Sequence, residues 1–71
     1  MREVSIVAEN TKRIINERGL KQKAVAAKAG YTVKAFSNLM TARKIMTDQD
    51  IQAISEALEV SPNDLFRRID A

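Results

Sequence analysis

Hydrophobic residues recur at helical spacing in two long segments of the chain. They return every three or four positions, which places them on one face of a helix. The first segment, residues 4–18, carries Val4, Val7, Ala8, Thr11, Ile14 and Ile15 on this face, and the second carries Ile51, Ile54 and Leu58. Because no stretch alternates hydrophobic and polar residues as a half-buried strand does, we expect helices and no strands.

Residues that begin and end helices divide the rest of the chain. Gly19 and Gly30 suit the positions after a first and a second helix, since glycine adopts the left-handed conformation at little cost. Thr32 provides an N-cap hydroxyl for a third helix from Val33 to about Met40. Two capping boxes, Thr47-Asp48-Gln49-Asp50 and Ser61-Pro62-Asn63-Asp64, precede a fourth helix and a last helix that carries Leu65, Phe66 and Ile69.

We therefore predict an all-α fold. The 71 residues suffice for one hydrophobic core, so residues 1–71 form a single compact domain of five helices with short connections.

The two short helices around Gly30, residues 21–29 and 33–40, have the spacing of a helix-turn-helix. Ala26 has to be small where the helices cross, and Gly30 permits the turn. Three hydrophobic residues are spaced to bury the seam between the helices: Val25, Phe36 and Leu39. The sequence thus predicts a helix-turn-helix from Gln22 to Thr41.

Charge is distributed unevenly along the chain. The net charge is +3, but residues 1–20 carry +1, residues 21–44 carry +6 without any acidic residue, and residues 45–71 carry −4. A basic stretch of this kind neutralises phosphates, although a solvated lysine face of a helix has the same composition. The charge favours nucleic-acid binding in combination with the helix-turn-helix.

Several kinds of site are excluded by composition. The chain has no Cys and no His, so neither a disulfide framework nor a Cys/His zinc site can form. Its two glycines form no phosphate-cradling loop, and its acidic residues lie mainly at capping positions and on solvent faces, so we expect no enzymatic activity and no cofactor.

No signal sequence or membrane span can be drawn at the N-terminus, and a cytoplasmic location is expected.

Two parts of the sequence resemble the Cro and lambda-repressor family, also called the XRE family. Residues 20–30, LKQKAVAAKAG, are similar to the family motif Leu-Thr-Gln-x-x-Leu-Ala-x-x-x-Gly. Residues 54–61, ISEALEVS, followed by Leu65-Phe66, are similar to its closing motif. The resemblance implies a lambda-repressor-like domain that binds double-stranded DNA sequence-specifically, as a transcriptional repressor of phage, prophage or mobile-element type.

The same resemblance implies roles for individual residues. Bases would be read by residues of the third helix: Val33, Lys34, Ser37 and Asn38. Lysine can donate to guanine, asparagine can pair with adenine, and valine can touch the thymine methyl. Phosphates would be bound by residues around the helix-turn-helix: Gln22, Lys23, Thr32, Thr41, Arg43 and Lys44.

Two features depart from the family pattern. Relatives pair an Arg in the first helix with a Glu at the end of the third, where this chain has Ile15 and Met40, so we expect a hydrophobic contact instead. Relatives have Asn-Gly after the third helix, where this chain has Thr41-Ala42, so that either the helix continues or the loop differs.

Three further residues have alternative or purely structural interpretations. Tyr31 either contacts a phosphate through its hydroxyl or covers the edge of the core. Arg67 and Arg68 fall near the C-terminus of the last helix, where cations suit the helix dipole, and receive no DNA role.

A single recognition helix reads few base pairs, so we expect a weak homodimer on a palindromic operator with half-sites about 34 Å apart. The expected interface is the end of the fourth helix together with residues 65–69. An antitoxin that binds a toxin and represses its own operon is the alternative, and a helical interaction module without DNA activity is a third. The chain is compatible with a complete small regulator or with the excised N-terminal part of a larger repressor.

Overall fold

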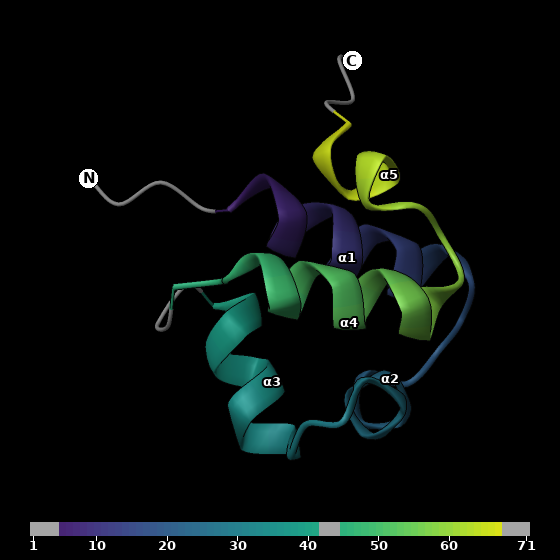
Figure 1. The fold of residues 1–71 in the computed structure, drawn as a ribbon. Coiled ribbons are helices and arrows are strands. Elements are labelled where there is room, and N and C mark those ends of the chain that lie inside the picture. Colours follow the sequence, from purple (N-terminus) through teal and green to yellow (C-terminus); the bar gives the residue numbers. More distant parts are fainter. Residues whose placement is uncertain (1–4, 42–44, 68–71) are drawn as a thin grey trace.

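The computed structural model describes residues 5–41 and 45–67, which contain five α-helices and no strand (Figure 1). The helices are α1 (Ile6–Glu17), α2 (Gln22–Ala29), α3 (Val33–Met40), α4 (Asp48–Leu58) and α5 (Pro62–Phe66). Helix α5 packs on α1 and α4, α2 packs on α4, and α3 packs on both α1 and α2. The expected all-α, five-helix architecture is confirmed. Within the described ranges, no helix is both long and apolar enough to cross a membrane.

Side chains set the starts of the helices. The Ser5 hydroxyl accepts a hydrogen bond from the Ala8 amide at 3.4 Å, so α1 begins at Ile6. The expected start at Val4 was therefore wrong, and Val4 itself lies outside the described residues. The capping box before α4 is confirmed, since the Asp50 amide donates to Thr47 Oγ1 at 3.2 Å and the Thr47 amide donates to Asp50 Oδ2 at 3.0 Å.

Left-handed residues follow three of the helices. Gly19 (φ +66°) and Gly30 (φ +88°) lie after α1 and α2, as predicted. At each of these turns the next amide donates back into the helix, from Tyr31 to the Ala26 carbonyl at 2.8 Å in the second case. Helix α4 ends in the same way, but its left-handed residue is Glu59 (φ +58°), the only residue other than glycine with a positive φ in the described part of the chain.

Residues from all five helices form one hydrophobic core. The core consists of Val7, Ala8, Ile14, Ile15, Val25, Ala26, Phe36, Leu39, Met40, Ile54, Ala57, Leu58 and Leu65. The seam predicted between the two short helices is thus buried. Ile15 and Met40 are both core residues, which agrees with the expected replacement of an ion pair by hydrophobic packing.

Two polar side chains link α1 to distant parts of the fold. Asn10, which is 4% exposed, donates from Nδ2 to the carbonyl oxygens of Leu65 at 2.6 Å and Arg67 at 2.8 Å. Arg18 donates to the carbonyl of Leu58 at 2.6 Å, at the end of α4. These contacts satisfy carbonyl groups that helix ends leave without an intrahelical donor.

The C-terminal region differs from the prediction in two respects. Helix α5 ends at Phe66 and Arg67 is extended (φ −69°, ψ 128°), so Arg67 lies beyond the helix and pairs with Asp64 at 3.3 Å. Leu65 is completely buried and offers no surface for a dimer. Arg68 and Ile69 lie outside the described residues.

Candidate nucleic-acid interface

Helix α3 presents one face to the core and the other to the outside. Phe36, Leu39 and Met40 are buried, whereas the four residues predicted to read bases are exposed or partly exposed: Val33, Lys34, Ser37 and Asn38. Val33 is 57% exposed, so its methyl groups are accessible to a partner surface. Ser37 follows Val33 by one helical turn and Asn38 follows Lys34 in the same way, so the four residues lie on the side of α3 away from the core, with Val33 and Lys34 exposed and Ser37 and Asn38 partly exposed.

Threonines flank this face at both ends, with different hydrogen bonds. Thr32 accepts from the Ala35 amide at 3.1 Å as the N-cap, and its hydroxyl hydrogen remains able to donate to a phosphate. Thr41, the C-cap residue, donates its hydroxyl hydrogen to the Ser37 carbonyl at 2.9 Å. A phosphate at Thr41 has to displace this bond, so Thr32 is the better placed of the two. Since α3 ends at Met40, the alternative in which the helix continues is excluded.

The start of α2 combines exposed polar residues with a positive helix end. Gln22 and Lys23 are exposed in its first turn, and within the described chain no side chain caps this helix at Lys21. The first turn contains no acidic residue. Amide groups and the helix dipole at such an end favour an anion, and the phosphate contact by Gln22 and Lys23 stays a prediction.

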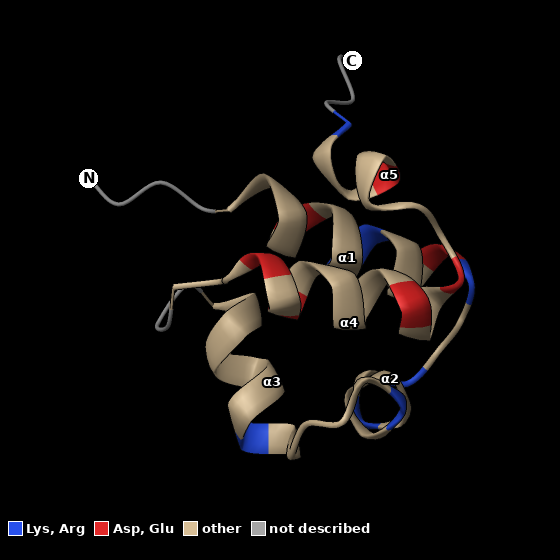
Figure 2. Cartoon of the chain, viewed as in Figure 1, with Lys and Arg blue, Asp and Glu red and all other residues tan. Residues whose placement is uncertain are grey.

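Helix α1 carries both acidic and basic residues, but the other helices differ in charge. Lysines lie on α2 and at the start of α3, while acidic residues lie along α4 and in α5 (Figure 2). Lys28 pairs with Glu59 at 3.2 Å, and both side chains are exposed, so this pair stabilises the fold only weakly. Lys21, Lys23 and Lys34 form no ion pair with any described residue. Arg43 and Lys44, also expected to bind phosphates, lie outside the described residues.

Tyr31, in the turn between α2 and α3, contacts the rest of the protein rather than facing solvent freely. Its hydroxyl donates to Asp50 Oδ1, and its ring lies 6.1 Å from the ring of Phe36. Burial, together with the neighbouring carboxylate, raises the pKa of Tyr31 to about 12. Of the two interpretations of Tyr31, the structure favours the one in which it covers the edge of the core.

The hydrogen bond between Tyr31 and Asp50 was not predicted from the sequence. The two residues are 19 positions apart, and helical periodicity carries no information about contacts between different helices. In the sequence, Asp50 is visible only as an acceptor in a capping box, and Tyr31 only as a tyrosine that follows a turn glycine. Neither feature indicates the other residue as its hydrogen-bond partner.

The fold and the sequence were compared with those of known proteins. A family described as Cro/C1-type HTH DNA-binding domain matches residues 10–71, while no curated protein gives a significant match. Among solved structures, the clp gene regulator ClgR from C. glutamicum is similar with a TM-score of 0.81 and 16% identity, over 87% of this chain and 80% of that one. The restriction-modification controller protein C.AhdI from Aeromonas hydrophila is similar with a TM-score of 0.79 and 18% identity, over 87% of this chain and 94% of that one.

At these identities the two structures support the fold alone, and the family match supports the function. It includes both helices of the helix-turn-helix and the whole exposed face of α3. The chain therefore belongs to the Cro/C1-type helix-turn-helix family and is a DNA-binding transcriptional regulator.

Proposed function

We propose that this protein is a repressor that inserts α3 into the major groove of its operator and reads bases with Val33, Lys34, Ser37 and Asn38. The observation that carries the proposal is the exposed face of α3, which holds these residues opposite the buried one. A major groove admits an α-helix, and the lysine, asparagine and valine side chains match the donors, acceptors and methyl groups of base edges. Occupancy of the operator then blocks transcription.

Phosphate contacts on both sides of α3 set its register on the DNA. We assign them to the start of α2, through Gln22 and Lys23, and to Thr32 at the start of α3. Exposure and the uncapped end of α2 support this assignment. Arg43 and Lys44 follow α3 in the sequence and are assigned to the backbone by their charge.

Selection of bound duplexes from a random library tests this function. At about 150 mM salt, the wild type is expected to enrich one palindromic sequence. The variant Lys34→Ala/Asn38→Ala is expected to enrich none.

The chain offers a matched control, because Lys12 and Asn16 place the same two side chains at the same spacing on the exposed surface of α1. Lys12→Ala/Asn16→Ala should enrich the same sequence as the wild type. Equal enrichment by both double variants would contradict base reading by α3.

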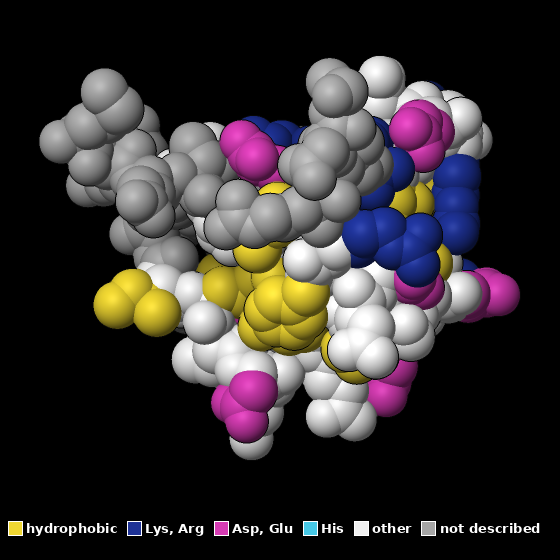
Figure 3. Space-filling model, turned by 90° about the horizontal axis from the view of Figure 1, so that it is seen from above, with side chains coloured by type: hydrophobic (Ala, Val, Ile, Leu, Met, Phe, Trp, Pro, Cys, Tyr) yellow, Lys and Arg dark blue, Asp and Glu magenta, His cyan; other side chains and the backbone are white. Residues whose placement is uncertain are grey.

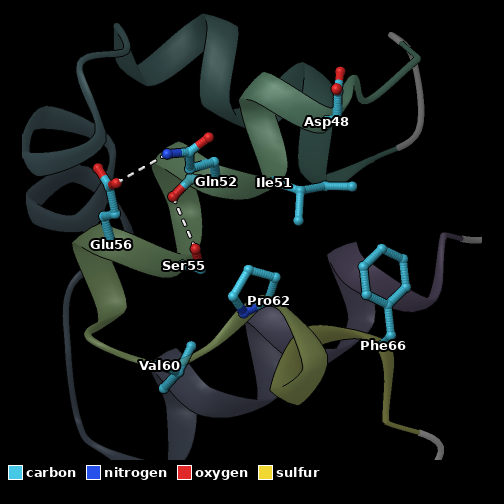
Figure 4. Close-up of a pocket in the computed structure, with 8 residues that line it drawn as sticks. All are labelled: Asp48, Ile51, Gln52, Ser55, Glu56, Val60, Pro62 and Phe66. Carbon is cyan, nitrogen blue, oxygen red and sulfur yellow. Dashed lines mark hydrogen bonds between the residues drawn. The ribbon is translucent and has the colours of Figure 1, made fainter.

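A palindromic operator requires a homodimer, and we assign its interface to the surface between α4 and α5. A hollow of about 490 Å³ lies there, with Ile51, Val60, Pro62 and Phe66 among its lining residues (Figure 4). Phe66 is 50% exposed, and hydrophobic side chains gather on the side of the molecule seen in Figure 3. Exposed hydrophobic surface of this kind gains stability from a partner.

Two acidic residues in the hollow's lining, Asp48 and Glu56, make this dimer weak. In a two-fold interface both copies bring these negative charges to the same surface, and the resulting repulsion is screened by salt. Sedimentation velocity should therefore show more dimer at higher salt, and Phe66→Ser should abolish it. A wild type that binds its operator as a monomer would contradict the assignment.

The alternative function is that of an antitoxin, and the same hollow favours it to a lesser degree. A hydrophobic groove with acidic side chains suits a basic segment of a partner protein such as a toxin. A toxin gene beside this one, and co-purification of its product with the wild type but not with Phe66→Ser, would support the antitoxin.

A further inference from the structure

The turn before α3 and the N-cap of α4 both form hydrogen bonds with one carboxylate. Tyr31, in the turn that precedes α3, donates its hydroxyl hydrogen to Asp50 Oδ1. Thr47, which follows the loop after α3, donates to Asp50 Oδ2 from its amide and from its hydroxyl, each at 3.0 Å. Asp50 lies in the first turn of α4, so its bond from Tyr31 connects the turn before α3 to that helix, while its bonds from Thr47 fix the carboxylate within the capping box of α4.

Within residues 5–41 and 45–67, the other side-chain hydrogen bonds of α3 and its caps are local to the helix. It packs on α1 and α2, mainly through Phe36, Leu39 and Met40, which are hydrophobic. Hydrophobic packing is not directional, whereas a hydrogen bond to a charged acceptor is both directional and comparatively strong. The bond from Tyr31 to Asp50 therefore constrains how α3 is turned relative to α4.

Tyr31 is itself held firmly enough to transmit such a constraint. Its amide donates to the Ala26 carbonyl at 2.8 Å, which fixes its backbone to the end of α2. Its ring is partly buried and lies 6.1 Å from the ring of Phe36, a core residue of α3. The hydroxyl therefore cannot leave Asp50 without a shift of the turn or of the ring.

We propose that Tyr31 and Asp50 are positioning residues that determine DNA specificity, because their hydrogen bond sets the orientation of α3 in the major groove although neither residue contacts DNA. This inference rests on the proposed base reading by α3. A tilt of the helix moves the side chains that reach base edges, but it has little effect on phosphate attraction, which depends on the number and position of cations.

Tyr31→Phe tests the inference, since it removes only the hydroxyl group. The dissociation constant is measured for the selected operator and for a random duplex. The operator should bind about three- to tenfold more weakly, because a hydrogen bond can bias an orientation by no more than its own free energy. The random duplex should change by less than about twofold. A loss of folded protein would weaken binding to both duplexes equally.

The second capping box provides a matched control for Asp50. Asp64 accepts from the Ser61 amide at 3.1 Å and from its hydroxyl at 3.2 Å, in the same arrangement at the start of α5. Asp50→Ala should lower the operator-to-random ratio at least as much as Tyr31→Phe, and adding Tyr31→Phe to it should lower the ratio no further. Asp64→Ala removes a cap as well, but should leave the ratio unchanged.

Two results would overturn the inference while the DNA function stands. One is a Tyr31→Phe variant whose operator-to-random ratio stays within about twofold of the wild type, and the other is an equal loss of ratio in Asp64→Ala and Asp50→Ala. A wild type that prefers no duplex would instead overturn base reading. In that case, residual dipolar couplings of the free wild type and of Tyr31→Phe still measure the orientation of α3 relative to α4. A different angle in the variant supports the positioning role of the Tyr31–Asp50 bond. The same angle in both proteins overturns that role.

Discussion

Asn10 in α1 donates a hydrogen bond of 2.6 Å to the carbonyl oxygen of Leu65 in α5, across 55 positions of sequence. The same amide group donates to Arg67, so one side chain attaches the C-terminal helix to the first one. Asn10→Ala removes both donors and leaves a buried carbonyl without a partner. We expect the free energy of unfolding in urea to fall by about 2–3 kcal/mol.

Asn16→Ala is the control for this change, because Asn16 lies on the exposed surface of the same helix. Its free energy of unfolding should stay within about 0.5 kcal/mol of the wild type. Equal effects of the two substitutions would show that the bonds of Asn10 contribute nothing beyond helix propensity.

Asn38→Ala should weaken binding to the selected operator by about 1–3 kcal/mol and relax the preference at one base pair. The reason is the loss of a side chain that offers both a donor and an acceptor to a base edge. Lys23→Ala is the comparison, since a phosphate contact has no sequence preference: it should weaken operator and random duplexes alike and reduce the salt slope by about 1. If both variants lost affinity uniformly across sequences, Asn38 would be a backbone contact.

Alkaline titration reports on Tyr31, the only tyrosine of a chain without tryptophan. Its pKa is raised from 10.0 to about 12, so the folded protein keeps the proton longer than the unfolded chain. The stabilisation by the neutral hydroxyl is therefore fully present below pH 10 and is lost as the pH rises through 10 toward 12. The near-ultraviolet absorbance of tyrosinate should appear with a midpoint close to 12.

The variant Tyr31→Phe separates the ionisation of Tyr31 from the titration of lysines, because the wild type and the variant contain the same lysines. The stability of the wild type should fall more steeply over this pH range than the stability of the variant. A tyrosinate midpoint near 10 in the folded protein would show that the hydroxyl is exposed and does not donate to Asp50.

Glu59→Gly should stabilise the protein slightly. A left-handed conformation costs about 1 kcal/mol or more in a residue with a Cβ atom, and glycine avoids this cost while losing about 0.5–1 kcal/mol through its greater freedom in the unfolded chain. We expect a net gain of about 0.5 kcal/mol in the free energy of unfolding. Lys28→Ala removes the Lys28–Glu59 ion pair without changing the backbone and thus isolates the electrostatic part. A clear loss of stability in Glu59→Gly would mean that this exposed ion pair outweighs the backbone strain.

Much of the fold followed from local features of the sequence. The glycines after α1 and α2 and the capping boxes before α4 and α5 act within a few residues, so the helix boundaries were predicted to within two positions at most of these ends. The outward face of α3 followed from the spacing of Phe36 and Leu39, because a buried face defines its opposite.

Contacts between distant segments could not be predicted in this way. Three hydrogen bonds depend on how the helices are arranged in space: from Asn10 to α5, from Arg18 to the end of α4, and from Tyr31 to Asp50. Helical periodicity contains no information about this arrangement. The left-handed turn at the end of α4 was also not predicted. Gly19 and Gly30 indicate such turns because they are glycines, whereas Glu59 is not. The burial of Leu65 was not predicted either, because periodicity in a five-residue helix does not determine which side of the helix faces the core.

The placement of lysines on α2 and α3 and of acidic residues on α4 and α5 gives the domain an electric dipole moment whose positive pole lies toward α2 and the start of α3, the side proposed to face DNA. Near a duplex, the field of the phosphates exerts a torque on this dipole, so the molecule rotates until α3 leads. The Debye length at physiological salt is about 8 Å, shorter than the 30 Å length of the protein, so this alignment occurs in the last few ångströms of approach. With α3 as the proposed reading helix, a molecule that leaves one site and binds the next therefore arrives with the same face toward the groove, and few encounters occur in the wrong orientation.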